Sequence, residues 1–170
     1  MELFDLYDLN KNKTGKIISR GDIVPSGMYR LVVHCCIFNT ENKMLIQQRS
    51  SNKSYPNRWD ISAGGCCQTG ETSQQAMKRE VSEELGIIID FNQAPNICFT
   101  FDEGFDDFYF VDKDLDLKTL TLQKEEVQNV KWATKEEIKE MITNGSFIKY
   151  HLSMIDFLFE IKSNKDIYKE

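Results

Sequence analysis

Hydrophobic and polar residues are arranged along the first part of the chain in the manner of β-strands. Residues 2–8 alternate between apolar and polar side chains, and residues 10–15 carry turn-forming Asn and Gly. Residues 16–19 are predicted to form the returning strand. Residues 29–38 are apolar and rich in β-branched side chains, which predicts a buried strand. After a short turn, residues 44–48 are its expected hairpin partner. The start of the chain is therefore predicted to form two hairpins.

Further along, strand-like segments alternate with helix-like ones. Residues 72–85 form a helical run whose apolar positions recur every four residues, with Thr72 as N-cap and Gln75 at capping-box spacing. A second helix is expected over 135–141 behind Thr134 as its cap. Other strands are expected at 59–62, 87–91, 97–101, 105–111 and 127–132, and a third helix over 146–160. This pattern predicts an α/β protein with a mixed β-sheet and helices on its faces.

Composition and charge narrow the class of protein. At 170 residues, with 41% hydrophobic residues, the chain fits one domain with a full core. Its formal net charge of −6 argues against broad nucleic-acid binding. The N-terminus lacks the features of a signal peptide, and no apolar run approaches a membrane span. We therefore expect a cytoplasmic protein with neither nucleic acid nor membrane as partner.

Five cysteines include two adjacent pairs, at 35–36 and 66–67. An odd count with vicinal pairs fits a disulfide framework poorly, so reduced thiols are expected. A zinc site would need a second Cys or His cluster, and the chain has only two histidines. We therefore do not expect zinc.

The most informative chemistry lies where a glycine-rich turn, residues 63–72, leads into an acidic helix. Glu80 and Glu84 share a helix face at i, i+4 spacing, and Glu83 lies beside them. Three carboxylates this close repel one another, and a hard divalent cation that prefers oxygen ligands removes that cost. A solvated acidic face is the alternative for such a string taken alone. The preceding glycine turn and Glu71 favour the metal site.

Residues 65–87 resemble the Nudix box, G-x5-E-x7-R-E-U-x-E-E-x-G-U with U apolar, and match it at every fixed position. The resemblance implies a Nudix-type α/β/α sandwich and hydrolysis of a diphosphate linkage with Mg²⁺, for which Mn²⁺ is a substitute. It implies one domain over 1–170, with 1–27 as an N-terminal β-hairpin extension packed on it. Nudix enzymes are frequently dimers, so a homodimer is one of the oligomeric states that the resemblance allows.

The resemblance also implies roles for individual residues. Glu80, Glu83 and Glu84 would carry catalysis and most of the metal ligation, and the Gly64 backbone carbonyl would supply a further ligand. Glu71 and Arg79 would hold the loop against the helix. The structural positions of the motif are Gly65, Glu71, Arg79 and Gly86.

Beyond the box, the chain resembles a Nudix subgroup that is similar to type 1 isopentenyl-diphosphate isomerase. The shared pattern is Arg49, then Lys53, then Pro56 and Trp59. If the roles of the matching isomerase residues apply here, Arg49 and Lys53 would bind the substrate diphosphate. The alternative is that both residues belong to a solvated basic loop without a binding role. The isomerase itself needs a cysteine where this chain has Gly64, and histidines that this chain lacks. Isomerase activity is therefore the weaker alternative.

Two acidic positions outside the box are candidates for a general base. Glu126 precedes a predicted strand, and Asp107 lies within another, so either or neither completes the site. His34 sits in a buried-looking strand and is interpreted as structural. The leading hypothesis is a hydrolase of a small-molecule nucleoside diphosphate derivative. A sensor that binds a nucleotide without cleaving it is a further alternative, but such a protein would be expected to lose its box carboxylates.

Overall fold

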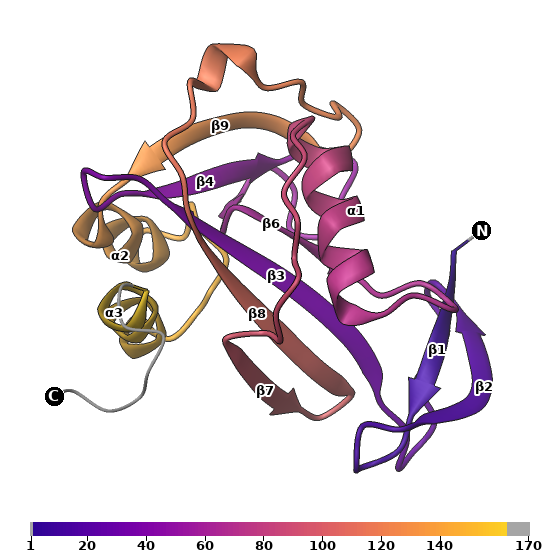
Figure 1. Cartoon of the computed structure of the whole chain (residues 1–170). Coiled ribbons are helices and arrows are strands. Elements are labelled where there is room, and N and C mark those ends of the chain that lie inside the picture. The colour runs from indigo at the N-terminus through magenta and orange to yellow at the C-terminus, as the bar shows by residue number, and fades with distance from the viewer. Residues whose placement is uncertain (1, 163–170) are drawn as a thin grey trace, which may run out of the picture. The chain divides into compact units, whose positions relative to one another are not determined.

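A computed structural model describes residues 2–162 of the chain (Figure 1). Their contacts divide them into two compact units. The first unit contains residues 2–35, 64–82 and 88–109, and the second contains residues 36–63, 83–87 and 110–162. Each unit is built from three separate stretches of sequence, so residues far apart in the chain meet inside both.

Within this described part, the secondary structure is a mixture of short strands and three α-helices. The strands are β1 (Leu3–Tyr7), β2 (Lys13–Ser19), β3 (Arg30–Phe38), β4 (Met44–Arg49), β5 (Trp59–Asp60), β6 (Ala63–Cys66), β7 (Ile97–Phe101), β8 (Gly104–Asp112) and β9 (Val127–Ala133). The helices are α1 (Ser73–Leu85), α2 (Lys135–Thr143) and α3 (Leu152–Ile161), with a 3₁₀ turn at Leu117–Thr119. β1 pairs with β2 alone. The larger sheet has the order β5-β4-β3-β8-β7, with β6 on β3 and β9 on β4. The predicted α/β class with a mixed sheet is confirmed.

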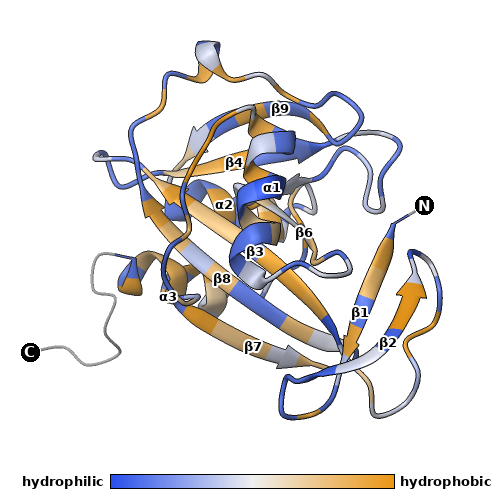
Figure 2. Cartoon of the chain, turned by 45° about the vertical axis from the view of Figure 1, so that its right-hand side comes forward, coloured by the Kyte–Doolittle hydropathy of each residue, from blue (hydrophilic) through white to orange (hydrophobic). Residues whose placement is uncertain are grey.

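In the first unit, β1 and β2 form the expected antiparallel hairpin, with Leu3 opposite Ser19. Phe4 and Leu6 point inward from β1 and are almost completely buried. The visible turns of α1 are mainly hydrophilic (Figure 2), whereas Met77 at its centre is fully buried. The helix is therefore amphipathic, which is what the four-residue repeat predicted.

In the second unit, β4 pairs with β9 in antiparallel register, with Met44 opposite Ala133. Helices α2 and α3 contact each other, and Phe159 of α3 packs edge-on against Phe38 at 5.1 Å between ring centroids. Dense aromatic packing of this kind stabilises the second core.

Both predicted helix caps are confirmed. The Thr72 hydroxyl accepts from the Gln75 amide at 3.2 Å, and the Gln75 side chain accepts from the Thr72 amide at 2.8 Å. Thr134 and Glu137 form the same reciprocal pair at the start of α2. These local bonds satisfy backbone donors that the first turn of each helix leaves without partners.

One predicted element was wrong, and two others have different bounds from those predicted. Residues 87–91 form no strand, and Ile88 at the start of that run is 76% exposed. The expected helix over 146–160 begins only at Leu152, because residues 146–148 bond to the backbone of Trp59 instead. The strand expected at 59–62 is divided, since β5 ends at Asp60 and the glycine-rich run itself forms β6.

Candidate functional site

Arg79 joins the turn before α1 to the helix itself. Its Nε and Nη2 donate to the two carboxylate oxygens of Glu71 at 2.7 and 2.9 Å, and Nη2 also donates to the Cys66 carbonyl at 3.1 Å. Nη1 donates to Oε1 of Glu80 at 2.8 Å. The Glu71 carboxylate accepts a further bond from the Gln68 amide at 2.8 Å. A two-point guanidinium–carboxylate contact of this kind fixes both the distance and the orientation of the Glu71 carboxylate relative to Arg79.

The electrostatics of this clamp keep both partners charged. Burial opposes ionisation of Glu71, but hydrogen bonds from Arg79 and the Gln68 amide outweigh it and hold the pKa of Glu71 below its usual value. Burial likewise disfavours the charged guanidinium, yet the neighbouring Glu71 and Glu80 carboxylates raise the pKa of Arg79. The clamp is therefore an ion pair at every pH near neutrality.

The two glycines before the turn are in close contact with functional side chains of the first unit. A Cβ on Gly65 would lie 2.2 Å from Oε1 of Glu80, so only glycine lets the carboxylate approach. A Cβ on Gly64 would lie 2.2 Å from Cδ2 of His34. His34 is held in place because its Nδ1 lies 2.7 Å from Oδ1 of Asp106. The histidine that sequence interpretation treated as structural therefore borders the glycine expected to supply a metal ligand.

In the second unit, Glu84 is held by a neighbouring amide. Gln47 of β4 donates from Nε2 to Oε2 of Glu84 at 3.1 Å, and the two residues are only 4% and 5% exposed. Glu83, the residue before it, is exposed. Gly86 follows α1 with a φ of +69°, where the helix ends. No local pattern in the sequence distinguishes Gln47 from its neighbour Gln48.

Arg49 and Lys53 have different surroundings. Arg49 donates from Nε to the Ser54 carbonyl at 2.8 Å and from Nη1 to Oδ2 of Asp60 at 3.2 Å, so it braces the loop that follows β4. Lys53 on that loop forms an ion pair with Glu126. One predicted diphosphate ligand is thus in contact with the predicted general base.

Asp107, the other candidate base, lies inside the first unit. It is 1% exposed, and it accepts bonds from Nζ of Lys11 at 2.5 Å and from the Ser73 hydroxyl at 2.7 Å. This carboxylate therefore links the N-terminal hairpin to the start of α1. Its burial and partners favour a structural role over the abstraction of a proton from water.

The three carboxylates expected to bind a metal share one helix. Glu80, Glu83 and Glu84 occupy the last two turns of α1. Among residues 2–162, no three His, Cys, Asp or Glu side chains are gathered as a ready-made metal centre. The donor chemistry nevertheless fits a divalent cation, because carboxylate and carbonyl oxygens are the ligands that Mg²⁺ prefers.

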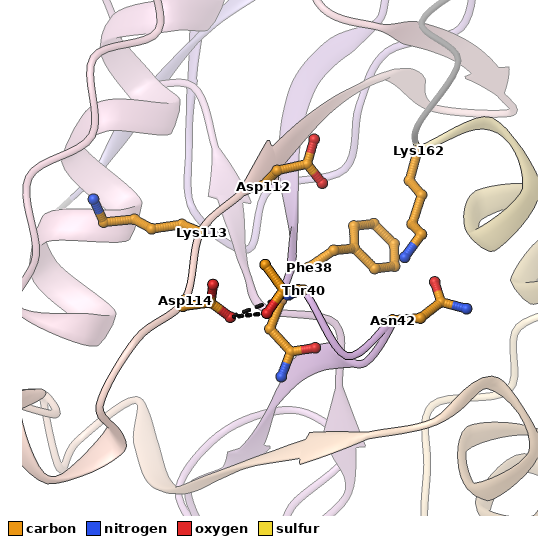
Figure 3. Close-up of a pocket in the computed structure, with 8 residues that line it drawn as sticks. Phe38, Thr40, Asn42, Asp112, Lys113, Asp114 and Lys162 are labelled. Carbon is orange, nitrogen blue, oxygen red and sulfur yellow. Dashed lines mark hydrogen bonds between the residues drawn. The ribbon is translucent and has the colours of Figure 1, made fainter.

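A separate hollow of about 530 Å³ lies in the second unit (Figure 3). Asp114 accepts bonds there from the Thr40 amide and hydroxyl, both at 3.0 Å. Nζ of Lys162 lies over the Phe38 ring, 4.7 Å from its centroid. The remaining lining residues are Asn39, Asn42, Asp112 and Lys113. No residue of the candidate site lines this pocket.

Comparison with known proteins settles the family. The NUDIX domain model matches residues 28–152, which is most of the chain. The chain belongs to the Nudix family. The uncharacterised Nudix hydrolase lmo0368 of Listeria monocytogenes is 45% identical over 170 residues, covering 99% of each chain. The crystal structure of DR0079 from Deinococcus radiodurans superposes with a TM-score of 0.76 at 27% identity, covering 92% of this chain and 98% of that one.

This Nudix hydrolase is thus an enzyme that acts on pyrophosphate bonds of small molecules, as its family does. Isopentenyl-diphosphate Delta-isomerase 1 of Mus musculus is a more distant relative, 27% identical over 172 residues, covering 85% of this chain and 74% of the mouse protein. That distant match agrees with the predicted subgroup. Across residues 2–162, this Nudix hydrolase has no helix with the length and apolar character needed to cross a membrane.

Proposed function

We propose that this chain is a Mg²⁺-dependent hydrolase that cleaves the diphosphate linkage of a nucleoside diphosphate derivative with metal-activated water. Mn²⁺ would serve as a substitute. The products would be two phosphorylated fragments, or a nucleoside monophosphate and a remainder. The supporting observation is the complete box, in which Arg79 ties Glu71 and Glu80 together and Gly65 leaves room for the Glu80 carboxylate.

The roles proposed for the chain's own groups follow from their chemistry. Glu80, Glu83, Glu84 and the Gly64 carbonyl would hold the cation, which when bound orients water and stabilises developing negative charge. Lys53 would bind the diphosphate as a point charge, with Arg49 beside it. Glu126, which contacts Lys53, would accept the proton of the attacking water.

The wider assignment is a single Nudix domain over 1–170, with 1–27 as its hairpin extension. We place the enzyme in the cytoplasm as a homodimer, with a small-molecule substrate as its partner. Isomerase activity is disfavoured because the isomerase-like pattern needs a cysteine at Gly64, and the His34 ring leaves no room for a Cβ there. A non-catalytic sensor is disfavoured because Glu71 and the three α1 carboxylates are all present.

The test is turnover of a panel of diphosphates with and without Mg²⁺. The panel contains nucleoside di- and triphosphates, nucleotide sugars, ADP-ribose, dinucleotides and isopentenyl diphosphate. We expect Mg²⁺-dependent hydrolysis of one nucleotide class, and a loss of at least about 100-fold in Glu84→Gln. Glu140→Gln, which alters an exposed carboxylate of α2, is the matched control and should retain full activity.

Other results of this assay would support the alternative functions or change the proposed ligand set. Conversion of isopentenyl diphosphate to its isomer would establish the isomerase alternative. Nucleotide binding without turnover of any compound would establish the sensor. Full activity in Glu84→Gln would remove Glu84 from the proposed ligand set.

A further inference from the structure

The loop between β4 and β5 presents an exposed aromatic ring. Tyr55 is 60% exposed, and tyrosine is a residue type of intermediate burial. Single exposed apolar residues are common on protein surfaces and need no explanation by themselves. The backbone and the bracing around Tyr55 distinguish it from such residues.

Tyr55 has a backbone conformation that is unfavourable for its type. Its φ is +53°, in the left-handed region that bulky side chains rarely occupy. Pro56 follows it and further restricts the preceding residue. Asn57 has a positive φ of +61° as well. Strain of this kind persists only where the surroundings hold it, and it is concentrated at functional sites.

Side chains from β4 and β9 hold the loop in this shape. Arg49 bonds to the carbonyl and hydroxyl of Ser54 at 2.8 and 3.1 Å. Gln48 bonds to the Asn57 carbonyl, and Gln128 bonds to the Asn57 side chain, both at 3.0 Å. The residues on both sides of Tyr55 are therefore anchored, so its ring is presented from a braced loop.

The braced loop is connected to the proposed catalytic helix within the second unit. Gln47 bonds to Glu84, and Gln47 is the cross-strand partner of Asp60. Cross-strand partners project from the same face of a sheet, and Asp60 in turn accepts a bond from Arg49. A chain of three neighbouring side chains thus leads from the Glu84 carboxylate to the base of the loop that carries Lys53 and Tyr55.

We propose that Tyr55 is a substrate-binding residue that stacks on the nucleobase of the substrate while Lys53 meets its phosphates. The inference rests on the proposed function. Arg58 lies over the Tyr55 ring at 5.7 Å from its centroid and helps to hold it. Because every nucleobase has a π-face, stacking gives affinity with little discrimination between bases. The substrate class is therefore nucleoside diphosphates with varied bases.

The experiment compares wild type, Tyr55→Ala and Tyr55→Phe. Dissociation constants are measured without divalent cation for ADP, CDP, GDP and UDP, and for methyl diphosphate, which has no base. In Tyr55→Ala we expect all four nucleotides to bind roughly tenfold more weakly, because one base–aromatic stacking contact is lost. The affinity for methyl diphosphate should change by less than about twofold, because this compound has no base to stack. Tyr55→Phe should bind like wild type. Phe157→Ala, which removes an exposed aromatic ring of α3, is the matched control and should also bind like wild type.

Three results would overturn the inference: unchanged nucleotide affinity in Tyr55→Ala, equal weakening for methyl diphosphate, or no nucleotide binding by wild type. Turnover with Mg²⁺ is measured on the same proteins. Tyr55-dependent binding without any hydrolysis would reject the proposed reaction and retain the stacking role. Hydrolysis with Tyr55-independent binding would reject only the stacking role.

Discussion

The side-chain amide of Gln47 holds the carboxylate of Glu84, with 3.1 Å between Nε2 and Oε2. Both residues are almost completely buried, although one is an amide and the other a carboxylic acid. A buried carboxylate needs hydrogen-bond donors to remain ionised, and residues that orient a metal ligand affect how well it binds. Gln47 is therefore expected to prepare Glu84 for the cation.

We predict that Gln47→Leu weakens divalent-metal binding by about tenfold, the lower end of the effect expected when a ligand loses its supporting hydrogen bond. Mn²⁺ titration followed by electron paramagnetic resonance measures this without turnover. Gln93→Leu, at an exposed position, serves as the control. Equal Mn²⁺ affinity in wild type and Gln47→Leu would remove Gln47 from this role.

A second prediction concerns the contact between Gly64 and His34. Gly64→Ala should lower the free energy of unfolding by roughly 1–3 kcal/mol, because its Cβ would overlap the imidazole ring. In a His34→Ala background part of that cost should disappear, while the part due to the Val33 carbonyl oxygen, 2.9 Å from the same Cβ, should remain. Denaturant unfolding of the two single variants and the double variant gives the coupling free energy. If the two single substitutions have additive effects on the free energy of unfolding, the His34 ring is not what excludes a side chain at position 64.

A third prediction concerns the pH dependence of the Glu71–Arg79 clamp. Because the pKa of folded Glu71 is lowered, its stabilising effect is complete above the ordinary glutamate pKa of about 4.3 and is lost as the pH falls through the lower folded value. Glu71→Gln should therefore lower the Tm at pH 7 by on the order of 5 °C, through loss of charge-assisted bonds. This difference in Tm should shrink below about pH 4.

Thermal unfolding from pH 3 to pH 8 measures this difference, with Glu140→Gln as the control at an exposed carboxylate. The control should stay close to wild type throughout. A difference between wild type and Glu71→Gln that stays constant in acid would contradict the clamp as the cause.

A fourth prediction concerns the cysteines. All five lie within the described residues as thiols, and Cys98 is exposed. Burial raises the pKa of Cys66, raises that of Cys67 to about 11 and also raises that of Cys98, so it is the exposure of Cys98 that sets it apart. One thiol per chain should therefore react with a thiol reagent in the native protein at pH 7.5. The Cys98→Ser variant should show no such reaction. Reaction of two or more equivalents before unfolding would contradict this.

Local signals were enough to predict part of this fold. The caps at Thr72 and Thr134 were correct because both partners of each capping box lie within three residues of one another. The late start of α3 was not predictable, because it depends on backbone bonds between residues 146–148 and the distant Trp59. Local periodicity carries no information about such a partner.

The same distinction applies to the candidate site. The box residues were recognisable because they lie within 23 positions of one chain segment. The contacts of His34 with Gly64, and of Gln47 with Glu84, join residues 30 or more positions apart. The Lys53–Glu126 pair could not be predicted for the same reason, although Lys53 was a candidate diphosphate ligand and Glu126 a candidate general base.

The ion pair between Lys11 and the buried Asp107 has a consequence for the evolution of this family. A relative that lost the N-terminal hairpin but kept this aspartate would leave the carboxylate inside its core without the lysine that pairs with it. Such an intermediate is unfavourable, so the two positions should change together across homologous genes. Sequences with a shortened N-terminus are therefore expected to carry an uncharged residue where this chain has Asp107.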